Sequence, residues 1–167
     1  AVAVAGLAAA AANEKNIPPE LLRWRGWVLH GVEQRLCPGE YNRGEARRCS
    51  WATSLKLELA AGGGRFAQQW LVFAESFVAL PGEVEIWPLE VRVDGKAAPV
   101  IGRDGIPGVR LEPGEHLVEG NFSWTEMPEM IKVPADTGLI RLTIDGSPVD
   151  FPIEDEGGRL WLRKRER

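Results

Sequence analysis

Histidine is scarce in this sequence, and the catalytic motifs that depend on it are missing. The 167 residues include two histidines, His30 and His116, and no Gly-x-Ser-x-Gly stretch. A serine hydrolase needs a nucleophile elbow and a histidine base, so this class of enzyme is not supported. His30 ends an apolar segment and His116 begins an alternating one, which favours packed or edge histidines over ligands.

Positive charge is not in excess either. The net charge is −4 and the sequence pI is about 5.3. Because nucleic-acid binding draws most of its affinity from clustered lysine and arginine, nucleic acid is not an expected partner. The one basic run, residues 163–167, is interpreted as a solvated tail.

No apolar run is long enough to cross a bilayer, which needs roughly 20 residues. The longest, AVAVAGLAAAAA, covers residues 1–12 and gives way abruptly to polar residues. Its small residues, Ala10 and Ala12 among them, fit the small-x-small rule of signal-peptide cleavage, although an alanine-rich structural helix is the alternative. We expect residues 1–16 to be the remnant of a signal peptide with its leader, and the protein to be exported.

The sequence has two cysteines, Cys37 and Cys49, separated by a polar loop rich in turn-forming residues. An exported pair of this kind is expected to form a disulfide, contributing about 3 kcal/mol in the chain-entropy model. A metal site that recruits His30 and His116 is less favoured, because the short chelating spacings of zinc sites are absent. A catalytic thiol would need a base and a lowered pKa, and neither can be inferred from the sequence.

Near the N-terminus, proline and glutamate at residues 18–20 begin a predicted short helix. Leu21, Trp24 and Val28 recur at helical spacing, and Gly31 is a candidate end. We expect this single helix to plug or flank the domain that follows.

Beyond Cys49 the apolar period changes to two, which predicts strands. Leu55, Leu57 and Leu59 alternate with charged residues and predict a half-buried strand before the glycines at 62–64. Residues 66–80 are apolar on both faces in their middle and are the candidate central strand.

Two Asp-Gly pairs predict hairpins in VRVDGKAAPV (91–100) and LTIDGSPVDF (142–151). Asp-Gly readily adopts the positive φ angles of a two-residue turn. Each stretch continues to another Asp and a short strand, which predicts two β-meanders related by a weak repeat.

Turn signals every eight to twelve residues predict seven to nine short strands in all. One strand follows the turn at Pro113 and places His116, Val118 and Phe122 on one face. The twelve prolines agree with strand edges and loops rather than helices. The predicted fold is mainly β: an antiparallel β-sandwich, immunoglobulin-like or jelly-roll-like, with one short N-terminal helix, forming a single domain over residues 17–167.

Three further motifs contain residue types that can support chemistry. The Glu83 and Glu85 pair is compatible with glycoside hydrolysis, but acidic surface residues are ordinary. The glycine run at 62–65 precedes a strand rather than a helix, so a hairpin connection is favoured over a phosphate loop. The third motif is a turn with hard oxygen donors, Asp150, Glu154, Asp155 and Glu156. These residues are compatible with a second hydrolytic carboxylate pair or with a calcium site. Because the spacing is not that of an EF-hand loop, a solvated turn is favoured.

Tryptophan is abundant, with seven in the chain. Trp70 and Trp124 share faces with core residues and are expected inside, and Trp51 is expected near the disulfide. Trp161, then Trp87, are the candidates for exposed rings; with Tyr41 they form the candidate ligand-facing aromatics.

The stretches IPPELLRWRGWVLHGVEQRLCP, WPLEVRVDG and GRLWLR resemble the N-terminal exported (periplasmic) region of large uncharacterised cell-envelope proteins of Gram-negative bacteria. The resemblance extends along nearly the whole chain. It implies a β-rich periplasmic region tethered to the membrane through downstream segments, and it brings no catalytic residues.

The favoured function is a non-catalytic structural or protein-interaction module, with no cofactor and no metal. Its expected partners are other domains of the same polypeptide or envelope proteins. A carbohydrate-binding module that uses the exposed tryptophans is the alternative, and a hydrolytic or metal-dependent enzyme is third.

Overall fold

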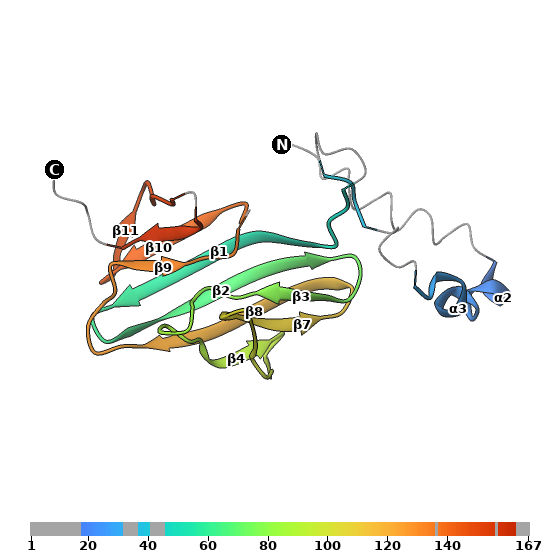
Figure 1. Cartoon of the computed structure of the whole chain (residues 1–167), viewed down its shortest axis with the longest axis horizontal. Coiled ribbons are helices and arrows are strands. Elements are labelled where there is room, and N and C mark those ends of the chain that lie inside the picture. The colour runs from blue at the N-terminus through green and yellow to red at the C-terminus, as the bar shows by residue number, and fades with distance from the viewer. Residues whose placement is uncertain (1–17, 32–36, 41–45, 136, 156, 163–167) are drawn as a thin grey trace.

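The computed structural model describes residues 18–31, 37–40, 46–135, 137–155 and 157–162. Its largest element is a seven-stranded sheet (Figure 1). In spatial order the strands are Ser147–Val149 (β11), Ile140–Ile144 (β10), Ser50–Ala60 (β1), Gly63–Val72 (β2), Gly114–Ser123 (β8), Leu89–Val93 (β4) and Lys96–Ala97 (β5).

A second layer covers one face of this sheet and consists of two smaller sheets. One is Ser76–Ala79 (β3), Ile106–Leu111 (β7) and Ile101–Arg103 (β6), in the order β3-β7-β6. The other is the ribbon of Met130–Lys132 (β9) and Arg159–Trp161 (β12). The predicted mainly β sandwich is therefore confirmed.

One hydrophobic core lies between the layers, because both contribute every second side chain to it. The seven-stranded sheet supplies Leu55, Leu57, Phe66, Trp70, Val118 and Phe122. The second layer supplies Val78, Leu80, Val109, Leu111, Ile131, Val133, Leu160 and Leu162.

The β1–β2 hairpin is the centre of the large sheet. Leu55, Leu57 and Leu59 are each at most 2% exposed, as the alternation predicted. The glycine run does make the hairpin connection, since Ala60 pairs with Gly63 across a two-residue turn. Residues 66–80 do not form one strand, however: β2 ends at Val72, and the chain crosses to the second layer as β3.

Two inward positions of the large sheet are unusual. Gln68 on β2 is fully buried, and neither its amide oxygen nor its amide nitrogen has a hydrogen-bond partner among the described residues. Gly120 on β8 allows close packing, because a Cβ there would lie 2.6 Å from Cε1 of Phe66 and 3.1 Å from Cγ2 of Val91.

The Asp-Gly hairpins form as predicted, and a third joins β6 to β7. The aspartates at 94, 104 and 145 have φ of 51°, 52° and 48°, and the glycines after them lie at 77–78°. The predicted meanders are wrong, because β5 and β6 belong to different sheets and so do β11 and β12. The described residues contain twelve strands, and one pairing, β1 with β10, is parallel.

The predicted single helix is two short ones, Pro19–Leu22 (α2) and Arg25–Leu29 (α3). They lie apart from the sheets in Figure 1, and α2 has no buried residue. The expectation that the helix plugs or flanks the sandwich is therefore wrong for these residues. No helix in the described ranges is long and apolar enough to cross a membrane.

Candidate functional site

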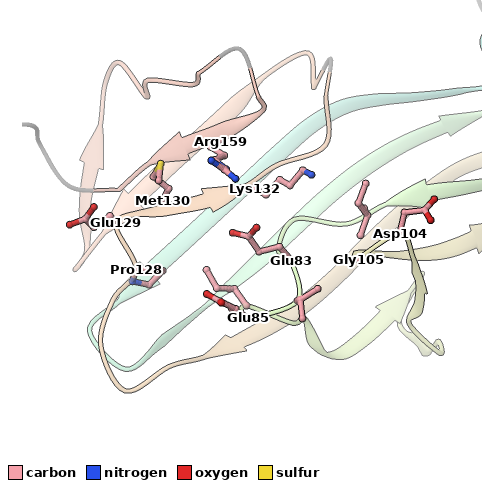
Figure 2. A pocket seen from close by; sticks show the side chains of 12 residues that line it. Glu83, Glu85, Asp104, Gly105, Pro128, Glu129, Met130, Lys132 and Arg159 are labelled. Carbon is pink, nitrogen blue, oxygen red and sulfur yellow. The ribbon is translucent and has the colours of Figure 1, made fainter.

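A groove of about 560 Å³ lies where two turns meet the β9–β12 ribbon of the second layer (Figure 2). Its walls are the turn at residues 83–86, the β6–β7 turn and the β9–β12 ribbon. The groove is lined by four acidic side chains and two basic ones: Glu83, Glu85, Asp104, Glu129, Lys132 and Arg159. We call it the charged groove.

A second cavity, of about 410 Å³, adjoins the charged groove and shares Ile106 and Lys132 with it. It runs between the end of β3 and residues 133–135, and it adds Glu154 and Asp155 to the lining. Together the two cavities follow the boundary between the β3-β7-β6 sheet and the β9–β12 ribbon.

Glu83 and Glu85, the pair compatible with glycoside hydrolysis, both line the charged groove. Glu83 and Ile86 close a tight turn by two backbone hydrogen bonds of 3.2 and 3.0 Å, which presents Glu85 at its tip. In Figure 2 both carboxylates lie on the wall opposite Lys132 and Arg159. Glu83 is half-buried and Glu85 is exposed.

Lys132 and Arg159 are direct partners in the β9–β12 ribbon. Like charges placed opposite each other on a ribbon repel, so this pair favours a negatively charged neighbour. Neither cation is ion-paired within the part of the chain that the structure describes. The groove therefore presents both signs of charge to a ligand.

The candidate calcium turn is organised around Asp155. Its Oδ1 accepts hydrogen bonds from the backbone N–H groups of Gly157, at 2.8 Å, and Arg159, at 2.9 Å. Glu156 lies outside the described residues. Over the described ranges, no three histidine, cysteine or acidic side chains are grouped as a metal site requires.

The tryptophans are arranged differently from the prediction. Leu160 and Leu162 point inward as expected, but Trp161 between them is half-buried, and so is Trp87, whose ring packs over Gly102. Tyr41 lies outside the described residues. The ligand-facing role of these aromatics stays a prediction.

The most exposed tryptophans are Trp27, at 77%, and Trp24, at 51%, on the two helices. The sequence did not indicate their exposure, because the helix that carries them was expected to plug or flank the domain. Trp70 is buried as predicted, and Trp124 is half-buried, stacked on Phe122 with ring centroids 6.0 Å apart.

The predicted disulfide between Cys37 and Cys49 is present. Two backbone hydrogen bonds support it across the loop, from Glu40 to Ala46 and from Arg48 to Pro38. Trp51 donates from Nε1 to the Arg48 carbonyl at 3.1 Å, so its ring lies beside the base of this loop.

His116 lies on the interior strand β8 and is half-buried, which agrees with a packed histidine, but its partner Asp94 was not predicted. Asp94 Oδ2 lies 2.7 Å from Nδ1 and the Glu112 carbonyl lies 2.9 Å from Nε2, so both ring nitrogens face acceptors. Burial lowers the pKa of His116, but the bonds to Asp94 and Glu112 outweigh it and raise the pKa above 6.5. The Leu117 N–H and His116 hold the pKa of Asp94 below 3.8. The arrangement suits a protonated imidazolium that donates to both acceptors.

His30, the other histidine, is exposed after α3. It ends the apolar segment as the sequence indicated and lies outside both cavities.

Comparison with known proteins adds little to this geometry. No family model and no curated protein matches the chain. Similar solved structures include an M1 zinc metallopeptidase from Deinococcus radiodurans (10% identity, TM-score 0.39) and a mutant of it bound to a Tyr-Ser-Ala substrate (10%, 0.40). The matches cover 69% of this chain and 38–39% of those chains, so this chain spans less than two fifths of their length. Similarity at this level supports no inference about family or activity.

Proposed function

We propose that this chain is a non-catalytic, polypeptide-binding module of an exported cell-envelope protein. The observation that carries the proposal is an exposed apolar surface on the two helices. Its members are Leu21, Leu22, Trp24, Trp27 and Val28, which are 45–77% exposed. We call it the helix surface.

The helix surface is typical of a contact site because its apolar groups are clustered rather than scattered. Trp24 and Trp27 pack edge to face, with ring centroids 6.4 Å apart, and Arg23 lies over the Trp24 ring. Tryptophan and arginine dominate the energetic centres of protein interfaces. Burying a ring as exposed as Trp27 against a partner contributes roughly 4 kcal/mol at 25 cal/mol per Å².

Export is supported by the disulfide, because such bonds persist in oxidising compartments. The resemblance to periplasmic regions of membrane-tethered envelope proteins points the same way. A periplasmic location and a tether through downstream segments are therefore part of the proposal.

The experiment is site-specific photocrosslinking in cells with the crosslinker at position 27. Position 151 is the matched control, because Phe151 is an 88% exposed aromatic outside the helices. We expect a discrete crosslinked polypeptide at 27 that is lost with Trp24→Ala and is absent at 151. Equal crosslinking at both positions, or none at 27, would contradict the proposal.

Carbohydrate binding is separated from this function by a titration. Tryptophan fluorescence is expected to stay constant when peptidoglycan fragments or oligosaccharides are added. A saturable change that Trp161→Ala abolishes would replace polypeptide binding by glycan binding.

A further inference from the structure

The outer edge of β3 carries backbone groups that no strand uses. Leu80 donates to the Pro107 carbonyl at 2.8 Å, and β3 pairs with β7 in antiparallel register. Hydrogen bonding alternates along an antiparallel strand, so Val78 bonds β7 while Phe77 and Ala79 direct their N–H and C=O groups away from it. Among the described strands, β3 has no neighbour on that side.

Strand β9 of the β9–β12 ribbon also carries backbone groups that its partner strand does not use. Val133 donates to Gly158 and Leu162 donates to Glu129, so the alternate residues Met130 and Lys132 direct their backbone groups away from β12. The Lys132 carbonyl accepts one hydrogen bond, of 2.8 Å, from the N–H of Gly82.

The second layer is thus a split sheet. Among the hydrogen bonds of the described residues, the one between Gly82 and Lys132 joins the two halves. Lys132 lines both cavities of the site, and Gly82 lines the second. Backbone groups need partners, so such a split is a template for an added strand.

Edge strands are commonly protected by a proline or a charge, which discourages further pairing. The other edge strands of the described sheets have one: Pro148 in β11, Lys96 in β5, Arg103 in β6, Lys132 in β9 and Arg159 in β12. The sequence of β3, SFVA, has neither. Its edge is the unprotected one.

Charge indicates which kind of strand fits. The two cavities are lined by six carboxylates against two cations, and Glu154 and Asp155 line the cavity at Ala79. An extended segment with lysine or arginine is therefore complementary, and an acidic one is repelled.

We propose that an extended, basic segment of another polypeptide adds as a strand to β3, bonding the backbone of Phe77 and Ala79. This mode of recognition takes affinity from main-chain hydrogen bonds and specificity from side chains. It gives the module a second contact surface, and it rests on the proposed function only in taking the ligand to be a polypeptide.

The test uses the whole chain with its disulfide intact and a synthetic probe, an acetylated, amidated heptapeptide of alternating lysine and valine. Amide hydrogen exchange is followed by NMR at Phe77 and Ala79. The comparison probes are the glutamate–valine analogue and the lysine–valine peptide N-methylated at alternate amides.

The decisive variant is Ala79→Pro, which removes an N–H that β7 does not use. Its matched control is Ala97→Pro in β5, another edge alanine. Ala98 donates to Val91, so the N–H of Ala97 also points away from the sheet.

We expect the basic peptide to protect both amides from exchange in a saturable way. Binding should be at least tenfold weaker for the Ala79→Pro variant and for the N-methylated probe. The affinity of the Ala97→Pro variant for the basic peptide should be unchanged. If Ala79→Pro does not fold, the N-methylated probe makes the same comparison on the unaltered chain. No protection at Phe77 and Ala79 up to millimolar peptide, or equal binding of the N-methylated probe, overturns the inference. Phe77 and Ala79 lie outside the helix surface. A negative result in this experiment would therefore not change the outcome expected for crosslinking at position 27.

Discussion

Replacing the buried Gln68 by methionine is expected to stabilise the protein. The side chain is 0% exposed, and its two amide atoms lack hydrogen-bond partners among the described residues. An unsatisfied buried polar group costs about 1–3 kcal/mol. Methionine has nearly the same length and no branching, and volume-conserving exchanges in a core cost less than about 1.5 kcal/mol.

A penalty of about 2 kcal/mol and a repacking cost of up to about 1 kcal/mol, taken from these ranges, give a gain of about 1–2 kcal/mol in the free energy of unfolding. For a domain of this size, 1 kcal/mol shifts Tm by about 2–4 °C, so the expected rise is about 2–8 °C. The assay is urea unfolding with the disulfide intact, in which the midpoint should rise while the m value stays constant.

The matched control is Gln69→Met, one residue along the same strand. Gln69 is exposed and its Oε1 accepts a hydrogen bond from Ser54 Oγ at 2.9 Å. Its replacement should change the stability by at most about 0.5 kcal/mol. The reasoning is refuted if Gln68→Met is less stable than the parent by 1 kcal/mol or more, because the amide would then be contributing a satisfied interaction.

Four further outcomes are expected. Because the pKa of His116 is raised, its contribution to the free energy of unfolding is complete below pH 6.5 and is lost as pH rises through the folded-state pKa. The urea midpoint should therefore fall as pH rises across this range, and His116→Gln should remove this pH dependence. Because the pKa of Asp94 is lowered, its contribution to the free energy of unfolding is present above pH 3.8 and is lost on further acidification. Asp94→Asn should therefore reduce the fall of the urea midpoint at acidic pH. Replacing Cys37 and Cys49 by serine should cost about 3 kcal/mol, and reduction of the parent should give the same midpoint; no loss would show that the loop is held by other contacts. Gly120→Ala should cost about 1–3 kcal/mol by crowding the aromatic ring beside it, measured by thermal unfolding, and a neutral result would mean that the sheet yields there.

Much of the candidate site could not be predicted from the sequence. The sequence places Glu83 and Glu85 close together, but Lys132 and Arg159 meet them only because β9 pairs with β12. The partner of His116, Asp94, is 22 positions away and reaches it through a hairpin. The open edge of β3 has no sequence signal, since SFVA resembles any buried strand.

The N-terminal segment illustrates the same limit. Apolar spacing predicts that a helix has a face to bury, but it does not say against what. Here the helices keep Trp24 and Trp27 exposed rather than covering the sandwich. The helix was expected to plug or flank the domain, whereas in the described residues its apolar side chains form an exposed surface.

The local features follow from the order of the residues alone: the alternating strand of Leu55, Leu57 and Leu59, the Asp-Gly hairpins and the covalent loop between the cysteines. Each depends on φ and ψ preferences, on a side-chain period of two, or on a short chain closure, and all of these act between near neighbours. Long-range packing sets three further features: β10 runs parallel to β1, residues 66–80 divide between two layers, and the second layer is split at Gly82 and Lys132. These features depend on which strands, distant in the sequence, bury each other's apolar faces, so they are determined by the packing of the whole chain.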